Sequence, residues 1–309
     1  MTRPYDDFMK VLALAMGWSG DSLPPMGADR WQAVYSIARR HAVQGIMFDA
    51  VEALPAGSGL PLDLSARWML EVRSLEANSQ HMEAVVARQR QTWAKHGVDA
   101  VLLKGLEVAA MYPHPRRRVC GDIDWWMRSQ ADWDKALEVL RSNGIAWEMD
   151  SDGDIHYTLA GVVIEHHHEG LEDDGPEGVL LLLNEHILHH ALVMGIGMRQ
   201  LCDYAAALKW YEGRFDKVHY AAMLRSRGLS KWTSVLEGSL GLAGAPFAVR
   251  YQRLSRMLLD LVMSDGNMGL DKSNRYGGLV RRMWLFMRVC PGALVRRWCS
   301  LVLGRLKRK

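Results

Sequence analysis

The stretch that decides the fold is Val119-Cys-Gly-Asp-Ile-Asp-Trp-Trp-Met127. Its alternating residues predict a β-strand, in which successive side chains point to opposite faces. Asp122 and Asp124 then project from one face, about 7 Å apart along the strand, and Ile123 projects from the other. Two carboxylates at this spacing repel each other unless a cation lies between them, and oxygen ligands favour a hard divalent ion. The strand therefore predicts a magnesium site on one face of a sheet.

Short strand-like and helical segments surround this strand. Six further elements are predicted within residues 98–170: strands at 99–104, 145–149, 155–159 and 162–168, and helical segments at 106–112 and 132–142. Glycine, proline, asparagine and aspartate residues separate them, as turns require. This order predicts an α+β fold, in which a small mixed sheet has helices on one side.

Helical periodicity fills the remainder of the chain. Helices are predicted at 6–16, at 31–54 with a break near Gly45, at 62–96, at 178–194 and at 198–211, with more to about residue 263 and a loop at 264–278. The pattern divides the chain into four regions: a helical N-terminal region 1–97, an α/β core 98–170, a helical C-terminal region 171–270 and a basic amphipathic tail 271–309.

The composition is that of a globular protein with a sizeable core. Of the 309 residues, 49% are hydrophobic and 24% are charged. No run of about 18 uncharged apolar residues predicts a membrane-spanning helix, and the acidic start Met1–Asp7 does not resemble a secretory signal. The four cysteines form no CxxC pair, which favours free thiols in a reducing compartment. A cytoplasmic location is therefore expected.

Positive charge is concentrated at the C-terminus. Residues 272–309 contain eleven Lys or Arg and no Asp or Glu, whereas the other 271 residues contain 27 basic and 35 acidic residues. Within 279–309, apolar residues recur on one side of two predicted helices and arginines fill other positions. This pattern fits a membrane-surface helix pair, docking on the acidic remainder of the chain, or a nucleic-acid patch. Nucleic acid is the least favoured partner, and peripheral membrane contact through 279–309 remains open.

Three neighbouring features strengthen the predicted metal site. Lys104-Gly105 follows the preceding strand, where glycine lets backbone amides approach phosphate and lysine adds a point charge. Arg118 stands four residues before Asp122, close enough to contact a phosphate. A downstream apolar strand presents Glu165, which would complete the metal site or take a proton from an attacking hydroxyl.

The histidine run 166–168 is not predicted to be a zinc cluster, because neighbouring side chains of a strand point to opposite faces. His167 shares the face of Glu165 and is the active-site candidate among the three. His186 and His190 lie four residues apart on a predicted helix, where they can meet on one face. Core packing or hydrogen bonding between helices is favoured for this pair over metal binding.

The order and spacing of several short motifs resemble a known family. The motifs are Leu103-Lys104-Gly105, Tyr112-Pro113, Arg118, Asp122-Ile123-Asp124 and Ile164-Glu165-His166-His167. Together they resemble the uncharacterised nucleotidyltransferase family of bacteria. They are similar, more distantly, to the AbiEii-type nucleotidyltransferase toxins and the aminoglycoside nucleotidyltransferases. Residues 184–190 and 197–203 resemble the helical region of the family, and the similarity spans roughly residues 31–210.

The resemblance implies a polymerase-β-like nucleotidyltransferase core, magnesium as cofactor and an NTP as co-substrate. It also implies that Asp122 and Asp124 bind the metal, that Glu165 is the third acid, and that Gly105 lines the phosphate pocket. One departure concerns the phosphate turn. Such enzymes generally carry Gly-Gly or Gly-Ser there, whereas this chain has Lys104-Gly105-Leu106.

These observations predict a magnesium-dependent nucleotidyltransferase that moves an NMP group from an NTP to an unidentified hydroxyl acceptor. Two alternatives stay open. The altered phosphate turn slightly favours a catalytically silent nucleotide-binding or scaffold protein of the same fold. The resemblance to toxins leaves open a nucleotidyltransferase that acts on tRNA or on a protein.

Overall fold

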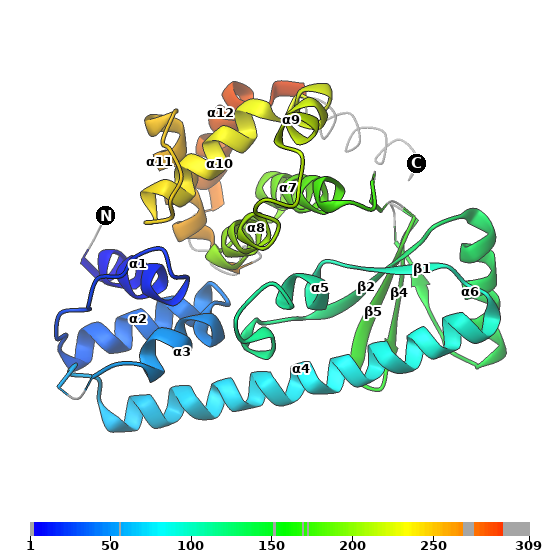
Figure 1. Ribbon diagram of the computed structural model, residues 1–309, viewed down its shortest axis with the longest axis horizontal. Helices are drawn as coiled ribbons and strands as arrows, with labels where there is room; N and C mark the ends of the chain where they lie inside the picture. Colours follow the sequence, from blue (N-terminus) through cyan, green and yellow to red (C-terminus); the bar gives the residue numbers. More distant parts are fainter. Residues whose placement is uncertain are drawn as a thin grey trace. The chain divides into compact units, whose positions relative to one another are not determined.

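The computed structural model describes residues 3–55, 57–150, 153–168, 170–171, 173–267 and 275–292 (Figure 1). The chain forms two compact units. One is Ser65–Asp174, and the other combines Met1–Leu64 with Gly175–Lys309. The predicted α+β fold is confirmed, because a small mixed sheet and its helices occupy the first unit and helices dominate the second. The predicted division into four regions stays a prediction.

Five strands form the sheet in the order β1-β2-β5-β4-β3. Their bounds are Ala100–Leu103 for β1, Asp122–Met127 for β2, Glu148–Met149 for β3, Ile155–Leu159 for β4 and Val162–His167 for β5. The central pair β2 and β5 is parallel, and the other three pairs are antiparallel. The sheet is therefore mixed, as the sequence predicts.

The strand predicted at 145–149 is shorter in the structure. The backbone N–H of Ile145 donates to the carbonyl of Leu140, which closes the preceding helix instead of pairing with a strand. Only Glu148 and Met149 pair with β4. The first residues of the predicted strand thus connect the end of the helix to β3.

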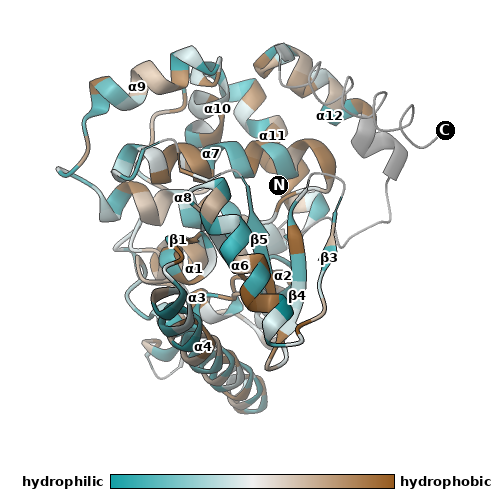
Figure 2. Cartoon of the chain, turned by 90° about the vertical axis from the view of Figure 1, so that its right-hand side faces the viewer, coloured by the Kyte–Doolittle hydropathy of each residue, from teal (hydrophilic) through white to brown (hydrophobic). Residues whose placement is uncertain are grey.

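One face of the sheet is covered by the helices α4 (Leu62–His96) and α6 (Gln130–Ser142). Figure 1 shows α4 running along the sheet, and Figure 2 shows both hydrophilic and hydrophobic residues on α6, as expected of a helix with one buried side. Side chains from both helices and from alternate strand positions form one core: Val86, Trp93, Ile123, Trp125, Trp133, Leu140, Ile155, Tyr157, Ile164. The remaining strand positions point to the opposite face.

A buried polar network fixes this core to the sheet. Trp125 Nε1 donates to Gln89 Oε1 at 2.9 Å, and Gln89 Nε2 donates to the Tyr157 hydroxyl at 2.8 Å. The Tyr157 hydroxyl lies 2.9 Å from Nε2 of His166. Because burial lowers the pKa of His166 to about 3, the ring is neutral, and it forms a neutral hydrogen bond with the Tyr157 hydroxyl. The network joins α4, β2, β4 and β5 at one register.

Two short elements lie between β1 and β2. These are α5 (Gly105–Ala109) and the 3₁₀ turn Pro115–Arg117. Arg116 pairs with Glu83 at 2.8 Å and Arg117 with Glu76 at 3.0 Å, both on α4. The loop before β2 is thereby held against α4.

The second unit is built from helices. They are α1 (Arg3–Ala15), α2 (Ala28–Arg40), α3 (Gln44–Glu52), α7 (Pro176–Val193), α8 (Met198–Trp210), α9 (Lys217–Ser226), α10 (Ser230–Leu242), α11 (Gln252–Asp265) and α12 (Arg275–Val289). The break predicted near Gly45 lies three residues earlier. Ala42 adopts a positive φ of 54° between α2 and α3, and Gly45 is inside α3. The predicted loop 264–278 ends earlier than expected, since α12 begins at Arg275; residues 268–274 lie outside the described residues.

The described part of the basic tail packs within the helical unit. Leu285, Phe286 and Val289 of α12 are buried, and the Phe286 ring lies 5.7 Å from that of Trp232 on α10. Arg282 pairs with Asp265 of α11 at 2.7 Å. Residues 293–309, which carry the second predicted tail helix, lie outside the described residues, so membrane contact stays a prediction. No helix in the described part of the chain is long and apolar enough to cross a membrane.

Candidate functional site

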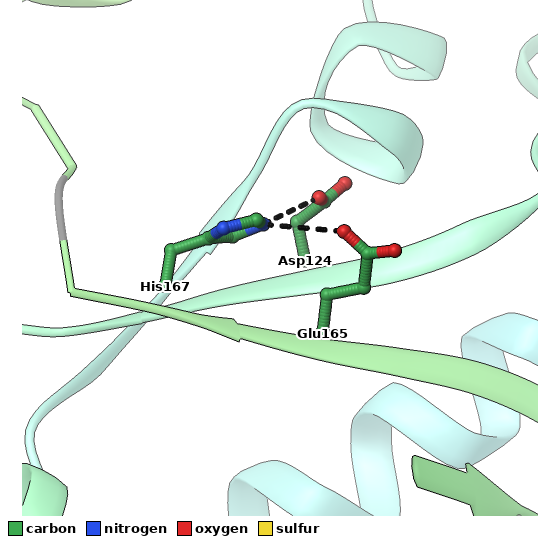
Figure 3. A group of neighbouring side chains, drawn as sticks. All are labelled: Asp124, Glu165 and His167. Carbon is green, nitrogen blue, oxygen red and sulfur yellow. Dashed lines mark hydrogen bonds and ion pairs between the residues drawn. The ribbon is translucent and has the colours of Figure 1, made fainter. Parts of the chain in front are cut away.

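Strand pairing brings two predicted site residues together on the sheet face opposite the core. In the parallel pair β2–β5, Asp124 is the partner of Glu165, and His167 lies two residues further along β5 on the same face. Asp124, Glu165 and His167 each offer one ligand atom, and these atoms lie within 4.8 Å of one another. Figure 3 shows the three side chains pointing toward one another from the two strands. The predicted shared face of Glu165 and His167 is therefore present.

Asp124 lies between two cationic groups. Its Oδ1 is 2.8 Å from Nε2 of His167 and 3.2 Å from Nζ of Lys104. Burial alone would raise the pKa of Asp124, which is 5% exposed. The hydrogen bond from His167 and the charge of Lys104 outweigh burial, and they lower the pKa of this carboxyl below its ordinary value. Asp124 is consequently an anion at neutral pH.

His167 is held by carboxylates at both ring nitrogens. Nδ1 lies 2.7 Å from Oδ2 of Asp154, and Nε2 donates to Asp124. Burial acts to lower the pKa of His167, but the two hydrogen bonds raise it to about 9. The backbone N–H of His168 donates to the second oxygen of Asp154 at 3.1 Å, which fixes that carboxylate in place. His167 is an oriented imidazolium in this arrangement.

Glu165 differs electrostatically from Asp124, although the two residues are partners in the sheet. Burial raises the pKa of Glu165, and the charges of Asp124 and Asp122 raise it further. His156, on β4, approaches it from the other side, with Nδ1 3.3 Å from Oε1 of Glu165. Two neighbouring carboxyls with pKa values shifted in opposite directions suit different roles, such as metal ligand and proton acceptor.

A second Asp–His pair parallels the first. Nε2 of His156 lies 3.1 Å from Oδ2 of Asp150, while its Nδ1 faces Glu165. Burial acts to lower the pKa of His156, but the hydrogen bond to Asp150 and the charge of Glu165 raise it. Each of the two carboxylates at the centre thus contacts a histidine, and each histidine contacts an outer aspartate, Asp154 or Asp150.

Sequence reasoning missed His156, Asp150 and Asp154. The composition of the acidic segment 150–154 predicts only a turn, and the alternation of the strand 155–159 does not indicate which strand it pairs with. The antiparallel pairing of β4 with β5 places His156 opposite Glu165. That register depends on the length of the hairpin turn. The contact between His156 and Glu165 can therefore be predicted only when the two strands are paired in the correct register.

Lys104 and Gly105 form a strained turn beside the acidic group. Lys104 has φ 48°, an unusual value for a residue with a side chain. Gly105 has φ 24°, and a Cβ there would lie 3.4 Å from the carbonyl oxygen of Asp122 and 4.0 Å from Oδ2 of Asp124. The turn brings the backbone close to the carboxylates and directs the lysine ammonium at Asp124. Phosphate binding by Lys104 and Gly105 stays a prediction.

Asp122 and Arg118 lie at the edge of the group. Asp122 is at the start of β2, and its charge reaches Glu165, but the compact set of three ligand atoms includes His167 in its place. Arg118 is 6% exposed, and its Nη1 donates to the carbonyl of Val119 at 3.1 Å and to Sγ of Cys120 at 3.2 Å. Metal binding by Asp122 and phosphate contact by Arg118 stay predictions.

The other histidines lie elsewhere. His166 points into the core, and the ring of His168 stacks on that of Trp133 at 3.5 Å, so both are on the face opposite His167, as expected. His186 and His190 meet on α7 of the helical unit with ring centroids 4.2 Å apart.

Comparison with known families found a match that includes this site. Residues 27–179 match the model of a family described as uncharacterised nucleotidyltransferase. The match covers the strands β1 to β5 and the whole acidic group, and it supports nucleotidyl transfer as the function of this part of the chain. Comparison with curated proteins and with solved structures gave no match. The more distant resemblance to AbiEii-type and aminoglycoside nucleotidyltransferases stays a prediction.

Proposed function

We propose that the protein is a magnesium-dependent nucleotidyltransferase that moves an NMP group from an NTP to a hydroxyl acceptor. One observation carries the proposal: Asp124 and Glu165 lie on adjacent parallel strands with ligand atoms within 4.8 Å of each other and of His167. This arrangement is inside the segment that matches a nucleotidyltransferase family. Asp122 lies two residues before Asp124 on the same face and is proposed as a further metal ligand.

The donor set fits a divalent cation. Carboxylate oxygens are the ligands of hard ions such as Mg²⁺, and an imidazole extends the choice to Mn²⁺ or Zn²⁺. Asp154 holds Nδ1 of His167 and so fixes the orientation of the ring beside the two carboxylates. In our proposal the carboxylates of Asp122 and Asp124 would hold magnesium, Glu165 would lie beside them as the third acid, and His167 would remain a hydrogen-bond donor.

Lys104 is proposed to change partner when substrate binds. Its ammonium neutralises Asp124 at 3.2 Å. With a divalent cation bound at Asp124, the Lys104 ammonium would be repelled from that carboxylate and would pair with a triphosphate. Gly105, whose missing side chain leaves the backbone open toward Asp122 and Asp124, is proposed to face the same triphosphate.

The residues then divide the chemistry between them. Bound magnesium would neutralise charge on the triphosphate and polarise the α-phosphoryl group. The acceptor oxygen forms a bond to the α-phosphorus, the bond from that phosphorus to the bridging oxygen breaks, and pyrophosphate leaves with the bonding electrons. Glu165, whose pKa is raised by burial and by neighbouring acids, takes the hydroxyl proton. His167 holds the carboxylate of Asp124 in its orientation through a charge-assisted hydrogen bond.

The test is magnesium-dependent binding of an NTP, followed by pyrophosphate release with candidate hydroxyl acceptors. Asp124→Asn keeps the shape of the side chain and removes its charge, so we expect it to abolish both. Asp134→Asn, an exposed acid of α6 in the same unit, is the matched control and should leave both unchanged. Magnesium-independent NTP binding, or binding unaffected by Asp124→Asn, contradicts the proposal.

One observation favours a second candidate, a nucleotide-binding or scaffold protein without turnover. Lys104 and His167 already neutralise Asp124, so the carboxylate has cationic partners before any metal binds. In that candidate the lysine takes the place of the metal permanently. NTP binding that does not depend on magnesium and never releases pyrophosphate distinguishes this protein from the enzyme.

A further inference from the structure

A cavity of about 550 Å³ lies within the helical unit, apart from the proposed active site. Its walls come from the end of α1, from α8, α9 and α10, and from the loops at 211–216 and 243–251. Its volume is in the range of about 300–1,000 Å³ found for ligand pockets. None of its lining residues falls in the segment 27–179 that matches the nucleotidyltransferase family, so that match gives the cavity no role.

Aromatic side chains from separate parts of the sequence line the cavity. Trp18 follows α1, Phe215 precedes α9, Tyr220 is on α9, and Phe247 follows α10. Tyr220 is buried, and the other three are half-buried. Aromatic faces carry a negative quadrupole, so a site walled by several rings favours a cation or a second aromatic ring.

Glu237, on α10, is the half-buried carboxyl among the residues that line the cavity. Burial raises its pKa, and the charge of Arg250 and a hydrogen bond from Tyr204 act in the opposite direction. Across the described residues, no basic nitrogen lies within 4.0 Å of its oxygens. A partly buried carboxylate costs free energy unless a cation pairs with it.

The other charged residues at the cavity are on its rim. Lys209, Lys217 and Glu212 are all exposed, so their charges reach solvent. Lys209 Nζ lies near Gly17, 3.7 Å from the position that a Cβ of this glycine would take, and it forms no ion pair with Glu237. Glu237 is therefore the least exposed of the charged residues that line the cavity, and the exposed ones carry both signs.

We propose that this cavity binds a small organic amine, whose ammonium group pairs with Glu237 and whose apolar body lies between Trp18, Phe215 and Phe247. The carboxylate supplies the counter-charge, and the rings supply cation–π contact and apolar area. The inference does not depend on the proposed nucleotidyl transfer, because every residue that carries it belongs to the helical unit.

Three probes of similar size test the choice of charge on the full-length protein: 2-phenylethylamine, 2-phenylethanol and phenylacetate. They share one aromatic body and differ in the charge of the end group. Isothermal titration calorimetry should rank the amine first, about tenfold tighter than the alcohol, with phenylacetate weakest. This ranking uses only the wild-type chain, so it stands even if a variant fails to fold.

Variants then locate the site. Glu237→Gln should reduce the affinity for 2-phenylethylamine to that for 2-phenylethanol, whereas Asp260→Asn, an exposed acid of α11 outside the cavity, should leave it unchanged. Phe247→Leu should lower the affinities for the amine and for the alcohol by similar factors. Three outcomes would each overturn the proposal. Phenylacetate could bind most tightly and lose its affinity in Lys217→Ala, the three probes could bind equally, or the amine could fail to bind up to its solubility limit.

Discussion

At the scale of single residues, the two candidate functions give Lys104 different roles. Its ammonium competes with any cation for Asp124 at 3.2 Å. We expect Lys104→Met to tighten Mn²⁺ or Mg²⁺ binding about tenfold in the absence of nucleotide, because a competing charge is removed. The same variant should weaken NTP binding in the presence of magnesium, because a phosphate partner is lost.

Calorimetric titration of the metal, with and without NTP, measures both effects of Lys104→Met. Lys95→Met, at the exposed end of α4, is the matched control and should change neither affinity. Weaker metal binding in Lys104→Met would show that the lysine supports the site instead of competing for it.

The two Asp–His pairs give a second prediction at this scale. Asp154→Asn removes one of the two carboxylates that hold His167, so the pKa of His167 should fall from about 9 toward its ordinary value of 6.5. Asp150→Asn removes the corresponding contact of His156 and should lower the pKa of that ring alone. NMR titration of the ring nitrogens reads out both. Equal shifts of His167 in the two variants would contradict the pairing described here.

The sequence predicts on which face of its strand each site residue lies, but it does not predict the register in which the strands pair. Asp122, Asp124, Glu165 and His167 can be placed on their faces from strand alternation alone, since that depends only on parity. The ion pair from Lys104 to Asp124 requires the positive φ of the turn, and the contacts of His156 require the hairpin register. The local sequence specifies neither the turn conformation nor the register, so neither contact can be predicted from it.

At the scale of elements, the network of Gln89 links α4 to three strands of the sheet. Gln89→Leu leaves the indole N–H of Trp125 and the hydroxyl of Tyr157 short of a partner in a buried region. An unsatisfied buried polar group costs about 1–3 kcal/mol, so we expect the free energy of unfolding to fall by about 2–4 kcal/mol. Urea denaturation measures the change.

Gln91→Leu is the control for this prediction, since Gln91 lies two residues away on the exposed side of α4. Gln91→Leu should change the free energy of unfolding by no more than about 0.5 kcal/mol, as for other surface substitutions. An equally small effect of Gln89→Leu would mean that α4 is held to the sheet by its apolar contacts alone.

The elements themselves were largely predictable because their signals are local. The helix at 62–96 has no internal glycine or proline, and Gly97 ends it at φ 62°. The break between α2 and α3 differs from its predicted position because glycine predicts a helix break at residue 45, whereas the turn uses a positive φ at Ala42. Tertiary packing overrides propensity at such positions, and most of α3 is buried.

At the scale of the whole molecule, each compact unit contains a buried, neutral histidine. Burial lowers the pKa of His166 in the sheet unit and of His41 in the helical unit to about 3, from an ordinary value of 6.5. His41 Nδ1 accepts a hydrogen bond from the backbone N–H of Met198, which requires the unprotonated nitrogen. Protonation of either ring therefore opposes the fold.

The consequence is a loss of stability on acidification. Because the folded pKa of each ring lies below its unfolded value, the unfolded chain binds more protons between pH 6.5 and about 3. The free energy of unfolding should fall as the pH is lowered through that window, by up to about 1.4 kcal/mol per pH unit for each histidine.

His41→Gln keeps a hydrogen-bond acceptor for Met198 without a group that titrates there, so the free energy of unfolding of this variant should depend less steeply on pH. His219→Gln, at an exposed position of α9, should keep the wild-type slope in denaturation curves recorded from pH 7 to pH 5. An unchanged slope in His41→Gln would mean that this ring does not resist protonation in the folded protein, and that the acid sensitivity arises elsewhere.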